Sequence, residues 1–206
     1  MLKRFISSFS IAAFALFPNM DVRAEEKTKG VYFVGSIGAG QMADIDIASS
    51  LGGGKFEFDT GFSGNLGIGY DFGSIRTEFT YNSTNTDLIG IQGTRVDIGA
   101  DVTSFLVSAA YDWRAEKKWQ PYIQAGLGTS EISLDLARTV GGVAITVGDD
   151  NISTAQLKVG VNYEANDSLD IYGEIWGQAF DDFTIGTINF TDCGMSGISL
   201  GLRVKV

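Results

Sequence analysis

The sequence has 206 residues, a length that suits one domain, with 27 glycines and only two prolines. Its 15 basic and 25 acidic residues give a formal net charge of −10, which argues against a nucleic-acid partner. The single cysteine excludes a disulfide framework, and the absence of histidine excludes histidine-based catalysis. Abundant β-branched and aromatic residues favour strands over helices.

The first 24 residues have the pattern of a secretory signal peptide. A basic start, MLKR, precedes the 13-residue apolar run FISSFSIAAFALF, and VRA before Glu25 resembles a cleavage site. The apolar run is too short for a membrane-spanning helix. We therefore expect residues 1–24 to be removed. Residues 25–206 then form the mature domain, with 12 basic and 24 acidic residues and a formal charge of −12.

The mature chain contains eight segments in which apolar and polar residues alternate with the period of two that is typical of strands. No helical pattern of ten to fifteen residues separates these segments, so the fold is expected to be all-β and antiparallel. The expected strands cover residues 30–47, 56–70, 74–85, 102–113, 120–136, 154–164, 169–180 and 197–206.

The connections between these segments alternate between short and long. The short ones are residues 71–73, 114–119 and 164–168. The longer ones are residues 48–55, 86–101, 137–153 and 181–196. All short turns therefore lie at one end of the sheet, an asymmetry typical of outer-membrane barrels. We predict an eight-stranded antiparallel up-and-down transmembrane β-barrel.

Aromatic residues at the segment ends indicate which face of the sheet meets lipid. In segment 102–113, Phe105 and Val107 alternate with Ser104 and Ser108. A membrane barrel turns such an apolar face outward and encloses the polar face. Amphipathic rings settle at the membrane interface, so an interfacial girdle explains the aromatics beside the short turns. The predicted girdle consists of Tyr70, Phe72, Tyr111, Trp113, Trp119 and Tyr163.

The polar face combines glycines with a few long charged side chains. In residues 158–176, Lys158 and Glu174 are expected to point into the lumen while Val159 and Ile175 meet lipid. The interior of an eight-stranded barrel is just wide enough for side chains to fill. Charges in such a space must be paired, because an unpaired buried charge is very costly. The sequence therefore predicts a plugged lumen with a charge network of Arg76, Glu78, Lys158, Glu174 and Arg203.

The phrases GVYFVGSIGAG, LGIGYDF and PYIQAGLGTS, with the export signal and eight strands, resemble small outer-membrane barrels of the opacity and attachment type. The transmembrane domain of outer-membrane protein A is similar in design. The resemblance covers residues 30–206. It implies an up-and-down barrel with both termini in the periplasm. It also implies a role as an adhesin, surface antigen, membrane stabiliser or narrow pore.

The sequence predicts neither a catalytic site nor a cofactor. The glycine pairs in GSIGAG and LGIGYDFG lie within strand alternation, whereas a dinucleotide loop turns from a strand into a helix. Glycines at i and i+2 line one face of a strand, which indicates packing in the lumen. Glu78 and Glu174 could act as an acid–base pair, but a plug of paired charges is the preferred interpretation. Cys193 is interpreted as an incidental free thiol.

The long connections are acidic. Oxygen-rich loops suit Ca²⁺ or Mg²⁺, which could bridge to lipopolysaccharide phosphates, but no calcium-loop spacing is present. Simply solvated loops without a metal are therefore expected. Two basic residues, Arg95 and Arg138, are set against eight acidic ones in these connections. The acidic residues are Asp87, Asp97, Asp101, Asp149, Asp150, Asp181, Asp182 and Asp192.

These features together predict a non-enzymatic integral protein of the bacterial outer membrane that presents acidic external loops for surface contact, adhesion or membrane structure. Its expected partners are outer-membrane lipid, lipopolysaccharide and ligands on host or neighbouring cells, and it is expected to be a monomer. Two alternatives remain open: a narrow porin for ions or small solutes, and a soluble periplasmic binding barrel of the lipocalin type.

Overall fold

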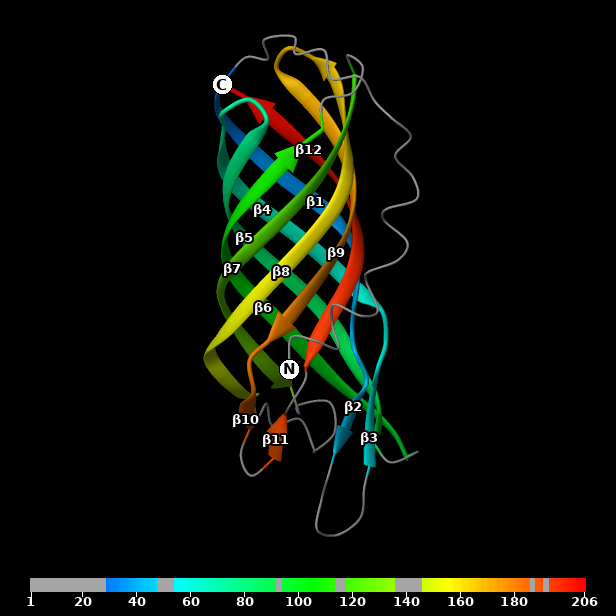
Figure 1. The fold of residues 1–206 in the computed structure, drawn as a ribbon. Helices are drawn as coiled ribbons and strands as arrows, with labels where there is room; N and C mark the ends of the chain where they lie inside the picture. The colour runs from blue at the N-terminus through cyan, green and yellow to red at the C-terminus, as the bar shows by residue number, and fades with distance from the viewer. Residues whose placement is uncertain are drawn as a thin grey trace.

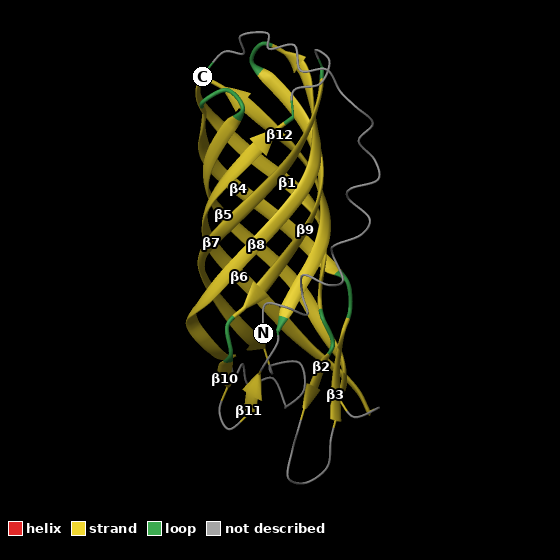
Figure 2. Cartoon of the chain, in the orientation of Figure 1, coloured by secondary structure: helices red, strands yellow, loops and turns green. Residues whose placement is uncertain are grey.

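The computed structural model describes residues 29–47, 54–91, 94–113, 118–135, 146–185, 188–190 and 193–206. These residues form strands, turns and short connections (Figure 2). The strands are β1 (Gly30–Met42), β2 (Ile45–Ile47), β3 (Gly54–Phe58), β4 (Gly61–Asp71), β5 (Ile75–Ile91), β6 (Thr94–Asp112), β7 (Trp119–Asp135), β8 (Thr146–Asn166), β9 (Leu169–Phe180), β10 (Phe183–Ile185), β11 (Ile188–Phe190) and β12 (Gly194–Lys205).

Eight of these strands close into a barrel (Figure 1). Strands β1, β4, β5, β6, β7, β8, β9 and β12 pair in that order, each antiparallel to its neighbour. The ring closes where β12 pairs with β1, for example through Leu202 and Gly35. The predicted eight-stranded antiparallel up-and-down barrel is confirmed.

The short turns lie together at one end of the barrel, beside the C-terminus (Figure 1). Between β4 and β5, Gly73 has a φ of 117°, which favours glycine, and its amide donates to Asp71 Oδ1 over 2.7 Å. Between β8 and β9, the amide of Ser168 donates to Asn166 Oδ1 over 3.0 Å, as in an Asx turn. This turn lies within the short connection predicted at residues 164–168, although β8 continues to Asn166.

The opposite end differs from the sequence prediction, because the strands are longer there than expected. β5 ends at Ile91 and β6 begins at Thr94, so most of the predicted loop 86–101 is a paired hairpin. β8 begins at Thr146, so the second half of the predicted loop 137–153 is strand. In these extensions, pairing with a neighbouring strand satisfies the backbone N–H and C=O groups whatever the side-chain pattern is.

One predicted strand and one further predicted connection also differ from the structure. The first predicted segment, residues 30–47, divides into β1 and β2, and β2 pairs with β3 beside the outer part of β5. Within residues 181–196, β10 pairs with β11, and β12 has already begun at Gly194. These small strands project from the same end of the barrel, which we call the loop end (Figure 1).

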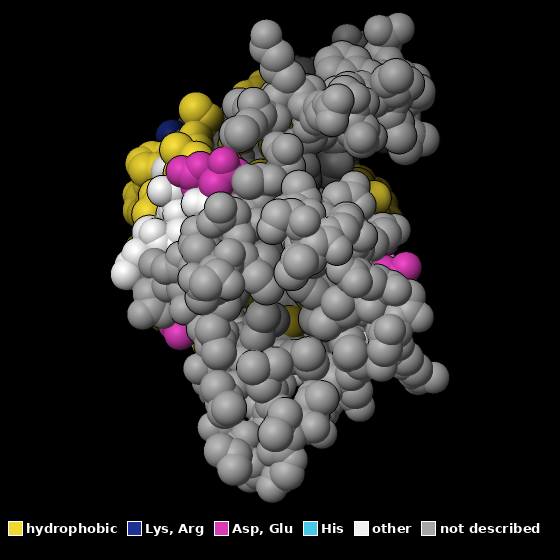
Figure 3. All heavy atoms as spheres, turned by 90° about the horizontal axis from the view of Figure 1, so that it is seen from below, with side chains coloured by type: hydrophobic (Ala, Val, Ile, Leu, Met, Phe, Trp, Pro, Cys, Tyr) yellow, Lys and Arg dark blue, Asp and Glu magenta, His cyan; other side chains and the backbone are white. Residues whose placement is uncertain are grey.

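The distribution of side chains is the reverse of that in a soluble protein. Apolar residues such as Leu66 and Leu127 are 69% and 70% exposed on the outer wall. Polar and charged residues such as Gln124 and Asp112 are buried inside. Seen from the loop end, hydrophobic side chains of described residues are visible on the outer flank, with acidic side chains beside them (Figure 3). This arrangement suits a wall in lipid around a polar interior.

Candidate functional site in the barrel lumen

The five charged residues predicted for the lumen all lie inside the barrel, each with at most 5% of its surface exposed. They come from β5, β8, β9 and β12, whose inward residues alternate with outward apolar ones. The five are Arg76, Glu78, Lys158, Glu174 and Arg203. The structure divides them into two connected groups, one around Arg76 and Glu78 and one around Lys158.

Arg76 forms a two-pronged pair with Asp112, a residue that the sequence analysis did not assign to the network. Arg76 Nε and Nη2 lie 2.7 and 3.0 Å from the two carboxylate oxygens of Asp112. The third nitrogen, Nη1, donates to Glu78 Oε1 over 2.9 Å. This fork geometry gives a strong and directional ion pair.

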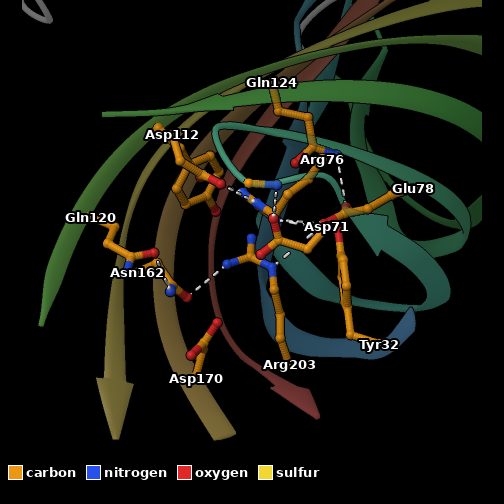
Figure 4. A network of polar contacts seen from close by, with 12 residues as sticks. Tyr32, Asp71, Arg76, Glu78, Asp112, Gln120, Gln124, Asn162, Asp170 and Arg203 are labelled. Atoms are coloured by element: carbon orange, nitrogen blue, oxygen red, sulfur yellow. Dashed lines mark hydrogen bonds and ion pairs between the residues drawn. The ribbon is translucent and has the colours of Figure 1, made fainter. Parts of the chain in front are cut away.

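Glu78 is the centre of the first group (Figure 4). Its Oε1 accepts a hydrogen bond from Tyr32 Oη on β1 at 2.7 Å, and its Oε2 accepts one from Gln124 Nε2 on β7 at 2.8 Å. Arg203 Nε, on β12, lies 3.5 Å from Oε1. One carboxylate thus connects β5 to three other strands across the lumen.

Arg203 lies between two tyrosine rings. Its guanidinium carbon is 4.1 Å from the ring centre of Tyr172 and 4.9 Å from that of Tyr122, within cation–π range. Its Nη1 also donates to Asn162 Oδ1 over 2.8 Å. Two aromatic rings thus contact this buried cation.

The second group is built on Lys158 and Glu174. Lys158 Nζ lies 3.0 Å from Glu174 Oε1, and Tyr122 Oη donates to Glu174 Oε2 over 2.6 Å. Both carboxylate oxygens therefore have partners. Tyr122 also stacks near Arg203, so its ring and hydroxyl connect the two groups.

Nearer the C-terminus, Lys205 Nζ lies 3.0 Å from Asp170 Oδ1. The sequence reasoning assigned neither residue to the network. The period of two could have identified the residues that were missed, because they alternate with apolar residues that point outward. The missed residues are Tyr32, Asp112, Tyr122, Gln124, Asn162, Asp170, Tyr172 and Lys205.

Inward glycines make room for the aromatic rings of the lumen. A Cβ at Gly160 would lie 2.6 Å from the Tyr122 ring and 2.6 Å from the Gly173 carbonyl oxygen. A Cβ at Gly69 would lie even closer to the Tyr32 ring, and one at Gly201 would lie even closer to the Tyr172 ring. Glycine on one strand thus lets a ring from another strand lie flat against its backbone.

The lumen changes character towards the loop end, which the sequence analysis did not predict. Six buried apolar residues from six strands face inward there, and we call them the apolar layer. On β1 the inward residues run from Tyr32 in the charge network to Met42 in this layer. The layer consists of Met42, Val102, Ile132, Ile152, Phe180 and Met195.

The residues of the predicted aromatic girdle lie beside the short turns and form three ring pairs. The ring centres are 4.6 Å apart for Tyr70–Phe72, 5.2 Å for Tyr111–Trp113 and 4.9 Å for Trp119–Tyr163. These side chains lie on the outer wall, and Trp119 is 59% exposed. Their contact with the membrane interface remains a prediction.

The acidic residues predicted for the loops are dispersed in the structure. Asp87 and Asp101 lie within β5 and β6, and Asp181 and Asp182 are exposed after β9. In the described parts of the chain, no three acidic or cysteine side chains are grouped closely enough to hold a metal. Arg138 and Asp192 lie outside the described residues, as do the side chains of Arg95, Asp97, Asp149 and Asp150. Cys193 is buried just before β12.

A closed barrel with an apolar outer wall and a charged interior defines an integral outer-membrane β-barrel protein. The outer membrane protein beta-barrel domain matches residues 5–205, and the chain belongs to that family. Among the described residues, no helix has the length and apolar character needed to cross a membrane. The signal peptide predicted at residues 1–24 lies outside the described residues and remains a prediction.

Solved structures of other outer-membrane proteins share this fold, including the following two. Neisserial surface protein A is 21% identical with a TM-score of 0.60, and the match covers 86% of this chain and 99% of that one. OprG from Pseudomonas aeruginosa is 16% identical with a TM-score of 0.53, covering 87% of this chain and 99% of that one. No curated protein matches the sequence. The identities show a common fold and carry no function across.

Proposed function

We propose that this protein is a non-enzymatic outer-membrane barrel with a plugged lumen, and that the segments at its loop end carry its function. The observation that supports the plug best is the position of Glu78. Its carboxylate contacts Tyr32, Gln124 and Arg203, which belong to three other strands of the barrel. Side chains from four strands thus meet across the lumen at this height, which supports a plug.

The energetics of buried charges favour a closed state. Removing one partner of a buried ion pair costs about 3–5 kcal/mol, because the other charge is left uncompensated. Opening the lumen requires the Arg76–Glu78 and Lys158–Glu174 pairs to separate or exchange partners. An open conformation is therefore rare unless water or another charge replaces the lost partners.

The loop end offers the surface for contact. β2, β3, β10 and β11 project there, together with the outer parts of β5 and β6 (Figure 1). Exposed acidic side chains at this end include Asp59, Asp101 and Asp181. Such a surface suits cationic groups on another cell, or lipopolysaccharide phosphates bridged by divalent cations. We propose that the outer wall lies in lipid and that the protein acts as a monomer.

A narrow pore is the second candidate, and a polar cavity in the lumen favours it. The cavity lies beside Lys158 and Glu174 and has about 20 Å³ of space for the centres of water molecules. A rearrangement of this ion pair could join the cavity to the periplasmic end. In that case the protein would pass ions, and the charge network would be its gate.

Potassium flux from vesicles separates the two candidates. We expect vesicles with the wild-type barrel to be as tight as protein-free vesicles, and Glu78→Gln to leak, because the central carboxylate then loses its charge. Glu131→Gln is the control, since Glu131 is exposed on the outside. Folding of each variant is checked by its gel mobility before and after boiling. A leaky wild-type barrel would support the pore instead.

A further inference from the structure

The cavity in the lumen lies between the charge network and the apolar layer. Residues from β1, β4, β5, β8, β9 and β12 line it, among them Ser36, Asn65, Thr84 and Gln178. On β8, the inward residues run from Asn162 through the cavity-lining Gln156 to Ile152 in the apolar layer. The lining is therefore polar, with charge on one side and apolar side chains on the other.

One polar atom in this cavity has no protein partner. Asn65 is 7% exposed, and its Oδ1 is buried without a hydrogen bond. A buried acceptor without a partner is costly, so such atoms in folded proteins are usually satisfied by ordered water or another ligand. Asn65 Oδ1 therefore needs a donor that the chain itself does not supply.

The size and charge of the cavity restrict what that donor can be. A space of about 20 Å³ for water centres holds about one or two waters, since about 10–15 Å³ is enough for one. Lys158 and Glu174 both line the cavity and pair with each other over 3.0 Å, so their charges offset each other and neither a cation nor an anion is favoured. An anion is disfavoured by the exposed lone pairs of Asn65 Oδ1. A small neutral donor remains, and water has the right size.

We propose that this cavity is a binding site for ordered water, which donates to Asn65 Oδ1. The ammonium group of Lys158 has three donors, so it can also donate to this water while it pairs with Glu174. This inference rests on the proposed plug and deepens it. Trapped water hydrates the Lys158–Glu174 pair on the side that faces the apolar layer. This pair is then the part of the network that can exchange partners most readily.

Water-to-indole cross-relaxation in the NMR spectrum of the refolded full barrel tests this site. The chain has three tryptophans, so only three indole N–H signals need assignment. Trp176 lines the cavity and donates its Nε1–H to Ser199 over 2.9 Å, whereas Trp113 and Trp119 lie on the outer wall as internal controls. The spectrum is recorded for the wild type and for Asn65→Leu, which removes the acceptor at similar size.

We expect the Trp176 N–H of the wild type to cross-relax with water of long residence time, and this signal to weaken at least twofold in Asn65→Leu. Absence of the signal in folded wild-type barrel, or an unchanged signal in folded Asn65→Leu, would overturn the water site and leave the plug intact. A Trp176 cross-relaxation signal with the sign of short-lived water, together with ion flux through the wild-type barrel, would overturn both the water site and the plug. The wild-type spectrum is decisive even where Asn65→Leu fails to fold.

Discussion

Arg76 and Asp112 are 36 residues apart in sequence and meet inside the barrel through two parallel hydrogen bonds of 2.7 and 3.0 Å. The pair joins neighbouring strands β5 and β6, whose register places Arg76 opposite Ala110, two residues from Asp112. Both side chains are about 2% exposed. Their pairing fixes the guanidinium in the orientation that also lets it contact Glu78.

Asp112→Asn is expected to destabilise the barrel by about 3–5 kcal/mol, because it leaves Arg76 buried with one counter-charge fewer. The free energy of unfolding in urea, measured in lipid vesicles, checks this value. Asp167→Asn is the matched control, since Asp167 is exposed in the β8–β9 turn and should change stability little. Equal stability of the two variants would contradict the assigned role of Asp112.

Exchanging the charges of Lys158 and Glu174 tests whether the pair acts as a unit. Lys158→Glu and Glu174→Lys alone each place like charges together and should raise ion leakage and lower stability. The double exchange restores opposite charges at two positions whose wild-type side chains are 3.0 Å apart, so leakage should return towards the wild-type rate. Purely additive effects of the two substitutions would show that the residues do not act on each other.

Gly160→Ala tests the packing of rings against glycines. The added Cβ would meet both the Tyr122 ring and the Gly173 carbonyl oxygen at 2.6 Å, so we expect a loss of about 1–3 kcal/mol from overpacking. Gly64→Ala is the control, because its Cβ would have its nearest neighbour at 3.6 Å. Urea unfolding of both variants measures the difference. A loss at Gly64 as large as that at Gly160 would reject the steric explanation.

Leu127→Arg places a charge on the wall assigned to lipid. Leu127 is 70% exposed, and a charge near the bilayer midplane costs about 2–4 kcal/mol. Ser74→Arg, in the β4–β5 turn, should cost about 0–1 kcal/mol, the value near the interface. Unfolding in vesicles gives both values. A harmless Leu127→Arg would mean that this wall does not face lipid.

Fluorescence quenching by brominated lipids tests the aromatic girdle. Trp113 and Trp119 lie on the outer wall beside the short turns, so bromine near the headgroups should quench them more than bromine at the chain ends. Trp176 is buried in the lumen and serves as an unquenched reference. Single-tryptophan variants separate the three signals. Strongest quenching by bromine at the chain ends would reject the interfacial position.

Much of the fold follows from local patterns in the sequence. The period of two assigned the inward and outward faces of the barrel strands, because apolar residues face outward and polar residues face the lumen. It also placed Arg76, Glu78 and Lys158 on the inward side, where the structure has them. The short connection predicted at residues 164–168 contains the β8–β9 turn, in which Asn166 accepts a hydrogen bond from the Ser168 amide.

The partners within the lumen could not be predicted in the same way. Which inward residues meet depends on the register of all eight strands, so the contact of Glu78 with Tyr32 and Gln124 is not visible along the chain. The strand extensions at the loop end were missed because apolar and polar residues alternate less regularly there. Outside the lipid, no face of a strand has to be apolar. The apolar layer was missed because Ile152 and Met195 fell in predicted loops.

Single-channel recording of the refolded residues 25–206 in a planar bilayer tests the plugged lumen most directly. The account predicts no discrete conductance steps from protein shown to be folded by its gel mobility before and after boiling. Reproducible steps from the wild-type barrel would contradict the plug. They would make the charge network around Glu78 the lining of an ion-conducting pore.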